Sequence, residues 1–255
     1  MNITMPINLA AAYTSPSQKA RVVTEGWARS NLFCPVCTTD RLTPTPANTR
    51  AVDFVCDNCE ESFQLKGKSS SFSNKVVDGG YNAFMAALSS DSAPNLFLLQ
   101  YDRVAWTVAN LVLVPHFALS PSAIECRKPL SASARRAGWV GCFILLSQVP
   151  LDARIGVVLA GQPVTKESIR AQYRRLLPLK QIAPSDRGWT LDVLNTARSL
   201  GKPEFTNADM YSRVRDLEAL HPENHHVKDK IRQQLQVLRD SGFVTHAGPG
   251  RWRIT

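Results

Sequence analysis

The sequence lacks both a membrane-spanning segment and the layout of a secretory signal. It has no run of the roughly 18 uninterrupted apolar residues that a bilayer-spanning helix requires. Its first residues, Met1 to Ile7, lack the basic and then apolar layout of a secretory signal peptide. We therefore expect a cytoplasmic protein, whose cysteines serve as thiols or metal ligands rather than in disulfides.

Acidic residues are also in deficit. The 255 residues include 21 Asp plus Glu against 30 Lys plus Arg, which gives a formal net charge of +9. An excess of this size favours a polyanionic partner, and nucleic acid is the commonest, although many basic proteins bind none. The hydrophobic share of 44% and the charged share of 20% are ordinary for a globular protein of one or two domains.

Four of the six cysteines form two CxxC pairs. Cys34 and Cys37 are separated from Cys56 and Cys59 by 18 residues, inside the window of about 15 to 20 residues typical of a zinc ribbon. Four thiolates can surround one zinc ion tetrahedrally, with two ligands from each CxxC turn. We therefore predict a structural zinc bound by these four residues, with two disulfides or buried free thiols as the alternatives.

Two short strand patterns flank the second CxxC pair. Residues 51–55 place one carboxylate, Asp53, among small or apolar residues, as a strand does. Residues 63–66 alternate, so that Gln64 and Lys66 share one face. If these strands pair as a hairpin, Asp53 meets Gln64 and Lys66 on one face.

These residue types suit the hydrolysis of a phosphodiester, which needs a divalent cation, an activated water and a cation near the developing charge. The Asp53 carboxylate, the Gln64 side-chain oxygen and the Leu65 carbonyl can bind Mg²⁺, and Lys66 can orient the water or stabilise the phosphate. The pattern resembles the PD-(D/E)xK nuclease core. Because Asp, Gln and Lys are common, a solvated strand face is the alternative.

Six segments, in order along nearly the whole chain, resemble the DpnI-like, dam-replacing family of methyl-directed restriction endonucleases. They are Ser17–Arg21, Cys34–Cys37, Val52–Cys56, Arg127–Leu130, Ala134–Trp139 and Lys230–Gln236. The resemblance implies cleavage of double-stranded DNA at GATC sites whose adenine is methylated. It also implies a mixed α/β nuclease domain that carries zinc, followed by a winged-helix domain.

One position departs from the family, which has Glu where this chain has Gln64. A neutral amide still offers an oxygen to a metal, but it brings no charge and cannot accept a proton. Magnesium should therefore bind more weakly, because it prefers carboxylates. The departure leaves open an alternative function, a catalytically weakened or inactive methyl-DNA-binding protein or regulator.

Apolar patterns elsewhere in the first 180 residues predict a mixed α/β layer. The stretch 15–31 is expected to form a helix with Val23 and Trp27 on its core face. On another face of this helix, a solvated Glu25 is favoured over a carboxylate near the metal. Strands are predicted at residues 96–101, 108–114, 139–146 and 155–160, and a turn into a helix at 78–81. A further helix from Thr165 to Pro178 should carry Arg170, Arg174 and Arg175 on a solvated face.

A basic stretch at residues 125–139 suits contact with a DNA backbone, because Arg and Lys neutralise phosphate. The phosphate-binding candidates from the front part are Lys68, Arg127, Lys128, Arg135 and Arg136. Trp139, which follows the stretch, is the candidate for reading the adenine methyl group. A solvated loop and a core tryptophan are the respective alternatives.

Residues 180–188 are predicted to be the linker between an endonuclease domain at 1–180, with its zinc ribbon at 34–59, and a winged-helix domain at 181–255. Three helices are expected, the first from near Thr190 and the second after residues 205–207. The third has its apolar residues in a 4-4-3 spacing, at Val227, Ile231, Leu235 and Leu238. A hairpin turn at 247–250 completes the wing.

The third helix is expected to enter the major groove of DNA, with the wing along the backbone. The candidates for DNA contact are His226, Lys228, Arg232, Gln233, Gln236 and Arg251. Arg232 and Gln233 suit base edges, whereas Lys228 and Arg251 suit phosphates.

Overall fold

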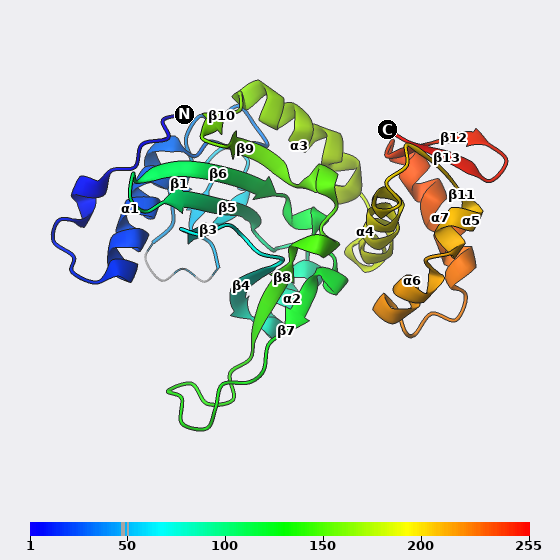
Figure 1. Cartoon of the computed structure of the whole chain (residues 1–255), viewed down its shortest axis with the longest axis horizontal. Coiled ribbons are helices and arrows are strands. Elements are labelled where there is room, and N and C mark those ends of the chain that lie inside the picture. The colour runs from blue at the N-terminus through cyan, green and yellow to red at the C-terminus, as the bar shows by residue number, and fades with distance from the viewer. Residues whose placement is uncertain (47–48, 50) are drawn as a thin grey trace. The chain divides into compact units, whose positions relative to one another are not determined.

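The computed structural model describes residues 1–46, 49 and 51–255, which fold into two compact units. Each unit is assembled from stretches that are far apart in the sequence (Figure 1). The first contains residues 1–73, 93–116 and 153–176, and the second contains residues 74–92, 117–152 and 177–255. Among the described residues, no helix combines the length and the apolarity that crossing a membrane requires.

A seven-stranded sheet in the order β1-β2-β3-β5-β6-β9-β10 forms the centre of the first unit. Its strands are β1 (Thr43–Pro44), β2 (Phe54–Val55), β3 (Ser62–Lys68), β5 (Asn95–Asp102), β6 (Thr107–Val114), β9 (Ile155–Leu159) and β10 (Gln162–Pro163). Neighbouring strands are antiparallel except β3 and β5, which are parallel with Leu65 opposite Phe97. Residues 96–99 of β5 are all at most 4% exposed, because this strand is covered on both faces.

Two helices pack in this part of the chain, α1 (Pro16–Asn31) and α3 (Lys166–Lys180), together with the short helix η1 (Ile7–Ala10). The predicted α1 is confirmed, since Val23 and Trp27 are both 0% exposed. The predicted end of α3 was two residues too early, because the helix continues through Pro178 to Lys180.

The second unit contains a three-stranded antiparallel sheet in the order β4-β8-β7. Its strands are β4 (Lys75–Gly80), β7 (Ile124–Cys126) and β8 (Gly141–Leu145). The helix α2 (Tyr81–Ser89) follows β4 directly, so the turn predicted at 78–81 is instead the end of a strand. Short helices occur at η2 (His116–Ala118), η3 (Pro121–Ala123), η4 (Leu146–Gln148) and η5 (Leu151–Ala153). Residues 127–140 leave the sheet as a long loop between β7 and β8 (Figure 1).

The C-terminal part of the second unit has the predicted helices and wing. Its elements are α4 (Pro184–Ser199), β11 (Glu204–Thr206), α5 (Asn207–Tyr211), α6 (Val214–Leu220), α7 (Val227–Asp240), β12 (Val244–Gly248) and β13 (Arg251–Ile254). The apolar face of α7 is confirmed, because its four predicted core residues are at most 4% exposed. The wing closes through Gly248 and Gly250, whose positive φ angles glycine adopts without strain. The predicted second helix is divided into α5 and α6.

The linker predicted at residues 180–188 is mostly helical. The helix α4 begins at Pro184 rather than near Thr190, because proline is well suited to the first turn of a helix. Arg187 is only 5% exposed and forms an ion pair with Asp91 at 2.6 Å. Its Nη2 also donates to the Ile182 carbonyl at 2.8 Å. A charged residue that looked typical of a linker is therefore a buried structural contact.

We predict that Ile231→Ala lowers the free energy of unfolding by about 2–5 kcal/mol, because truncating a fully buried side chain leaves a cavity. Ile231 is 0% exposed on α7. Gln236→Ala, on the exposed face of the same helix, is the control and should change stability little. Urea unfolding followed by circular dichroism measures both. Equal midpoints for the two variants would show that α7 is not packed as described.

Candidate active site and metal centre

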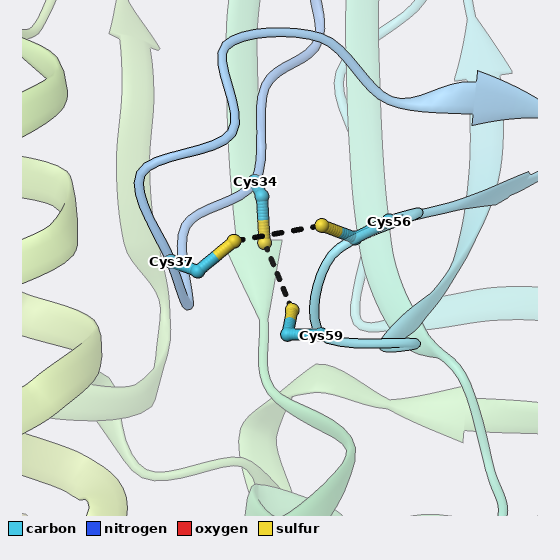
Figure 2. Close-up of side chains that lie close together, drawn as sticks. All are labelled: Cys34, Cys37, Cys56 and Cys59. Atoms are coloured by element: carbon cyan, nitrogen blue, oxygen red, sulfur yellow. Dashed lines mark hydrogen bonds between the residues drawn. The ribbon is translucent and has the colours of Figure 1, made fainter.

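The two CxxC pairs bring four thiols together in the first unit (Figure 2). The Sγ atoms of Cys34 and Cys59 are 3.6 Å apart, and those of Cys37 and Cys56 are 3.5 Å apart. All four sulfur atoms lie within 4.8 Å of one another. Zinc–sulfur bonds of about 2.3 Å in a tetrahedron require sulfur separations of about 3.8 Å. The cluster therefore fits a structural zinc site, in agreement with the predicted ligands.

Burial raises the pKa values of these thiols, and hydrogen bonds lower some of them. Burial raises the pKa of Cys34 well above its usual range and raises the pKa of Cys59 to about 11. Burial also acts to raise the pKa of Cys37, but hydrogen bonds with Thr39 and Asn58 outweigh it and bring the pKa to about 6. Because zinc binds thiolates, a metal must displace the protons of Cys34 and Cys59.

The second CxxC pair forms the loop of a hairpin between β2 and β3. Phe54 lies opposite Phe63, and Val55 lies opposite Ser62. Within the loop, the Cys56 amide donates to the Glu61 carbonyl at 2.9 Å. The predicted pairing of the two strands is therefore confirmed, and two of the four thiols lie at the closed end of the hairpin.

Asp53 lies directly before β2. Its amide donates to the Phe63 carbonyl at 2.9 Å, which holds Asp53 beside β3. Its carboxylate oxygen Oδ2 accepts a hydrogen bond of 2.7 Å from the Leu65 amide, in the backbone between Gln64 and Lys66. Gln64 is only 8% exposed, and Lys66 is half-buried. The structure thus brings the Asp53 carboxylate to the backbone of Leu65, whereas the meeting of Asp53 with the Gln64 and Lys66 side chains stays a prediction.

Asp53 and Leu65 line a cavity of about 960 Å³. Gln64 and Lys66 are not among the described residues that line it. The helix α1 contributes Glu25 to this lining. Glu25 was expected to be solvated, and it is 47% exposed and forms an ion pair with Arg21 at 2.9 Å. The carboxylate is therefore both hydrated and adjacent to the cavity that contains Asp53.

The helix α3 contacts the first CxxC pair through Arg170. The Arg170 Nε donates to the Cys34 carbonyl and its Nη2 to the Thr39 carbonyl, each at 3.2 Å. The guanidinium also lies 5.3 Å from the centroid of the Phe33 ring. The expectation of a solvated Arg170 is therefore wrong, whereas Arg174 and Arg175 are exposed as expected.

One turn later, a buried polar network connects α3 to Glu61, which follows the second CxxC pair. The Tyr173 hydroxyl donates to Asn95 Oδ1 at 3.1 Å, and Asn95 Nδ2 donates to Glu61 Oε2 at 2.9 Å. Burial raises the pKa of Tyr173, so its hydroxyl keeps the proton that it donates. Glu61 lies two residues after Cys59. This network was not predicted from the sequence, where the only signal for it is the polar Asn95 at the start of an apolar strand.

The basic loop between β7 and β8 brings its candidate residues into two groups. Lys128 and Arg135 are exposed. The Arg136 guanidinium lies 4.7 Å from the Trp139 ring centroid, and Arg127 lies 5.0 Å from that of Phe143. Trp139 is half-buried rather than in the core.

Gly141 is what allows Trp139 and Arg127 to come together at the base of this loop. A Cβ atom at Gly141 would lie 2.9 Å from the Trp139 ring and 3.3 Å from Arg127 Cδ. Any other residue at this position would therefore displace the Trp139 ring.

The candidate residues of the winged helix are all exposed. Those on α7 and the residue before it are His226, Lys228, Arg232, Gln233 and Gln236, all exposed, and Arg251 is exposed on β13. Arg232 forms an ion pair with Asp229 and a hydrogen bond of 3.5 Å with the Tyr211 hydroxyl. The Lys228 ammonium lies 5.6 Å from the Tyr211 ring centroid. Lys68, at the end of β3 in the first unit, is also exposed.

The fold and these sites define a mixed α/β protein with a four-cysteine site and a C-terminal helix-turn-helix domain of the DNA-binding type. The chain belongs to the Dam-replacing (DpnI) family, whose model matches residues 1–182. A model of the Dam-replacing HTH domain matches residues 185–254. The resemblance and the fold class expected from the sequence are both confirmed. Membership supports a methyl-directed restriction endonuclease that binds DNA.

We predict that Arg170→Gln speeds the release of zinc from the purified protein by about tenfold or more, because residues that hold a metal-bearing loop tune metal affinity. Arg174→Gln is the matched control, since Arg174 lies one turn later on the exposed side of α3. Release into a chromophoric chelator measures the rate. Equal rates for the two variants would contradict the role of Arg170, and purified protein without zinc would contradict the metal assignment.

Proposed function

We propose that this chain is a type II, methyl-directed restriction endonuclease that cleaves double-stranded DNA at GATC sites containing N6-methyladenine. The observation that carries the proposal is the hydrogen bond of 2.7 Å between the Asp53 carboxylate and the Leu65 amide. It joins the predicted carboxylate to the QxK strand within a chain of the Dam-replacing family. Residues 1–180 are the endonuclease domain, with its zinc ribbon at 34–59, and residues 181–255 are the winged-helix domain.

The donor atoms in the candidate catalytic site suit magnesium, because all of them are oxygens. We assign to Mg²⁺ the Asp53 Oδ1, the Gln64 side-chain oxygen and the Leu65 carbonyl. When bound, the ion supplies Lewis-acid stabilisation of the phosphate oxygens. Asp53 Oδ2 is held by the Leu65 amide, which fixes the carboxylate relative to the strand. Lys66 orients the attacking water or stabilises the charge that develops on the phosphate.

The zinc site has a structural role in this proposal. It closes the loop of the β2–β3 hairpin, which presents Asp53 and Gln64. The ligands are those predicted from the sequence, Cys34, Cys37, Cys56 and Cys59. A four-thiolate site leaves no open coordination position, so this zinc takes no part in the chemistry.

DNA recognition is divided between the two domains. In the winged helix, Arg232 and Gln233 contact base edges, and Lys228 and Arg251 contact phosphates. The other contacts come from Lys68, Arg127, Lys128, Arg135, Arg136, His226 and Gln236. Trp139 contacts the methylated adenine. Because one buried methyl group contributes only about 0.8 kcal/mol, discrimination requires several contacts or a reader in each domain.

A second candidate function rests on Gln64. Its neutral side chain, 8% exposed, takes the place of the carboxylate that the family pattern has there. Because a neutral ligand binds magnesium more weakly than a carboxylate, this chain would then recognise methylated DNA with little or no cleavage. Such a protein would act as a regulator.

Cleavage of one plasmid, prepared with and without adenine methylation, tests the proposal. With Mg²⁺ or Mn²⁺, we expect discrete GATC fragments from the methylated plasmid alone. Asp53→Asn should lower the rate by at least about 100-fold and leave selective binding intact, because it removes charge from the metal site. No cleavage with either metal, together with a selective gel shift of methylated duplex, would favour the binding protein instead.

Gln64→Glu tests the effect of the missing charge. We expect the Mg²⁺ concentration that gives half the maximal cleavage rate to fall by about tenfold, because ligand charge sets the affinity for hard cations. A titration of the single-turnover rate with Mg²⁺ measures this concentration. Gln172→Glu, on the exposed side of α3, is a control for a general effect of added negative charge. An unchanged or weaker response to Mg²⁺ in Gln64→Glu would show that charge at this position does not limit the site.

A further inference from the structure

One face of α1 lines the cavity that contains Asp53. Its residues Gln18, Arg21 and Glu25 all contribute to the lining. They are spaced three and four residues apart, which places them in one row along a helix. Gln18 and Arg21 belong to the segment Ser17–Arg21, one of those that resemble the family, and the proposed catalytic site gives this segment no role.

The guanidinium of Arg21 is held from both directions along this row. Its Nε donates to Gln18 Oε1 at 3.1 Å, and its Nη1 donates to Glu25 Oε2 at 2.9 Å. These two bonds fix the plane of the guanidinium while its Nη2 group keeps further N–H donors. The side chain is still 52% exposed, so a ligand in the cavity can reach it.

Stability does not account for this arrangement. An ion pair between exposed side chains contributes little to folding, because water and salt screen both charges. The arrangement does suit an anion. A planar, fixed guanidinium can bind two phosphate oxygens at once. DNA is the anion that the proposed function brings to this cavity.

We propose that Arg21 binds a phosphate of the DNA strand that enters the cavity beside Asp53, and that Gln18 and Glu25 are positioning residues for its guanidinium. The identity of the ligand as DNA rests on the proposed function. Arg21 then supplies a cation from α1, while the proposed metal ligands Asp53 and Leu65 approach the strand from the β2–β3 hairpin. Glu25 acts through Arg21.

The test compares Arg21→Gln with Lys19→Gln in the full-length, zinc-containing protein. Lys19 is on the same helix but is not among the described residues that line the cavity. Binding of a methylated GATC duplex is measured in Ca²⁺ at several salt concentrations, and single-turnover cleavage is measured in Mg²⁺. For Arg21→Gln we expect the slope of log K against log salt to become shallower by about 1, because one phosphate contact is lost. The cleavage rate should fall by about 10- to 100-fold.

Two further variants separate positioning from charge. Arg21→Lys should restore most of the salt dependence but not the cleavage rate, because lysine cannot bind two oxygens at once. Glu25→Gln should lower the cleavage rate while leaving the salt slope near that of the unmodified protein. Arg21→Lys also serves as the test variant if Arg21→Gln does not fold.

The outcomes distinguish this inference from the proposed function. Salt slopes and rates for Arg21→Gln that equal those of Lys19→Gln would overturn the role of Arg21 and leave the endonuclease intact. If the unmodified protein binds methylated duplex without cutting it, the endonuclease fails, and the salt slopes alone decide the role of Arg21. A protein that binds no methylated duplex would overturn both.

Discussion

The hydrogen bonds between β2 and β3 are the constraint on which the candidate catalytic site depends. The strand β2 has only two residues, Phe54 and Val55, so its own ladder is too short to hold Asp53 in place. The bond from the Leu65 amide to the Asp53 carboxylate extends the pairing, but a side-chain bond on a partly solvated edge is weak by itself. The hairpin therefore needs a constraint at its closed end, and the four thiols provide one there.

The thiol cluster is in turn held by a helix from far along the chain. Arg170 bonds to the carbonyls of Cys34 and Thr39, and Tyr173 reaches Glu61 through Asn95. Because these contacts come from one face of α3, the two halves of the cluster cannot move apart without breaking buried hydrogen bonds. A metal site alone fixes four sulfur atoms, whereas this arrangement also fixes the backbone on either side of them.

Gln64 has a physical consequence for this site apart from its effect on magnesium. A carboxylate that is 8% exposed would need a cation or several hydrogen bonds to offset the loss of hydration, whereas a buried amide needs only hydrogen bonds. The chain with Gln64 can thus fold around the site without a metal to neutralise it. The same neutral side chain would bind magnesium more weakly than a carboxylate. At this position, a residue that favours stability of the metal-free fold therefore disfavours affinity for the metal.

Sequence patterns predicted the parts of the fold that depend on neighbouring residues. The CxxC spacing, the flanking strands and the apolar face of α7 all follow from local periodicity, and the structure contains them. The missed features depend on distant contacts: Arg170 bonds to a carbonyl 136 residues away, and Arg187 pairs with a residue 96 positions away. A charged residue is predicted to be solvated when its partner is too distant in the sequence to be recognised. For this reason the metal centre was predictable from spacing, but its support by α3 was not.

In the proposed complex, the uneven distribution of net charge along the chain assigns most of the affinity for DNA to one part and most of the base recognition to another. Residues 186–255 hold 11 Lys plus Arg and 9 Asp plus Glu, so most of the net charge of +9 lies before the winged helix. Phosphate neutralisation supplies much of the affinity for DNA and carries no sequence information. A nearly balanced winged helix would bind random DNA weakly, and the proposed base contacts would then account for a larger share of its binding. The basic loop between β7 and β8 holds Arg136 against Trp139, which places a proposed phosphate-binding group beside the proposed methyl reader. Affinity and methyl recognition would then be coupled within one loop, and the winged helix would add a second reading of the same sequence.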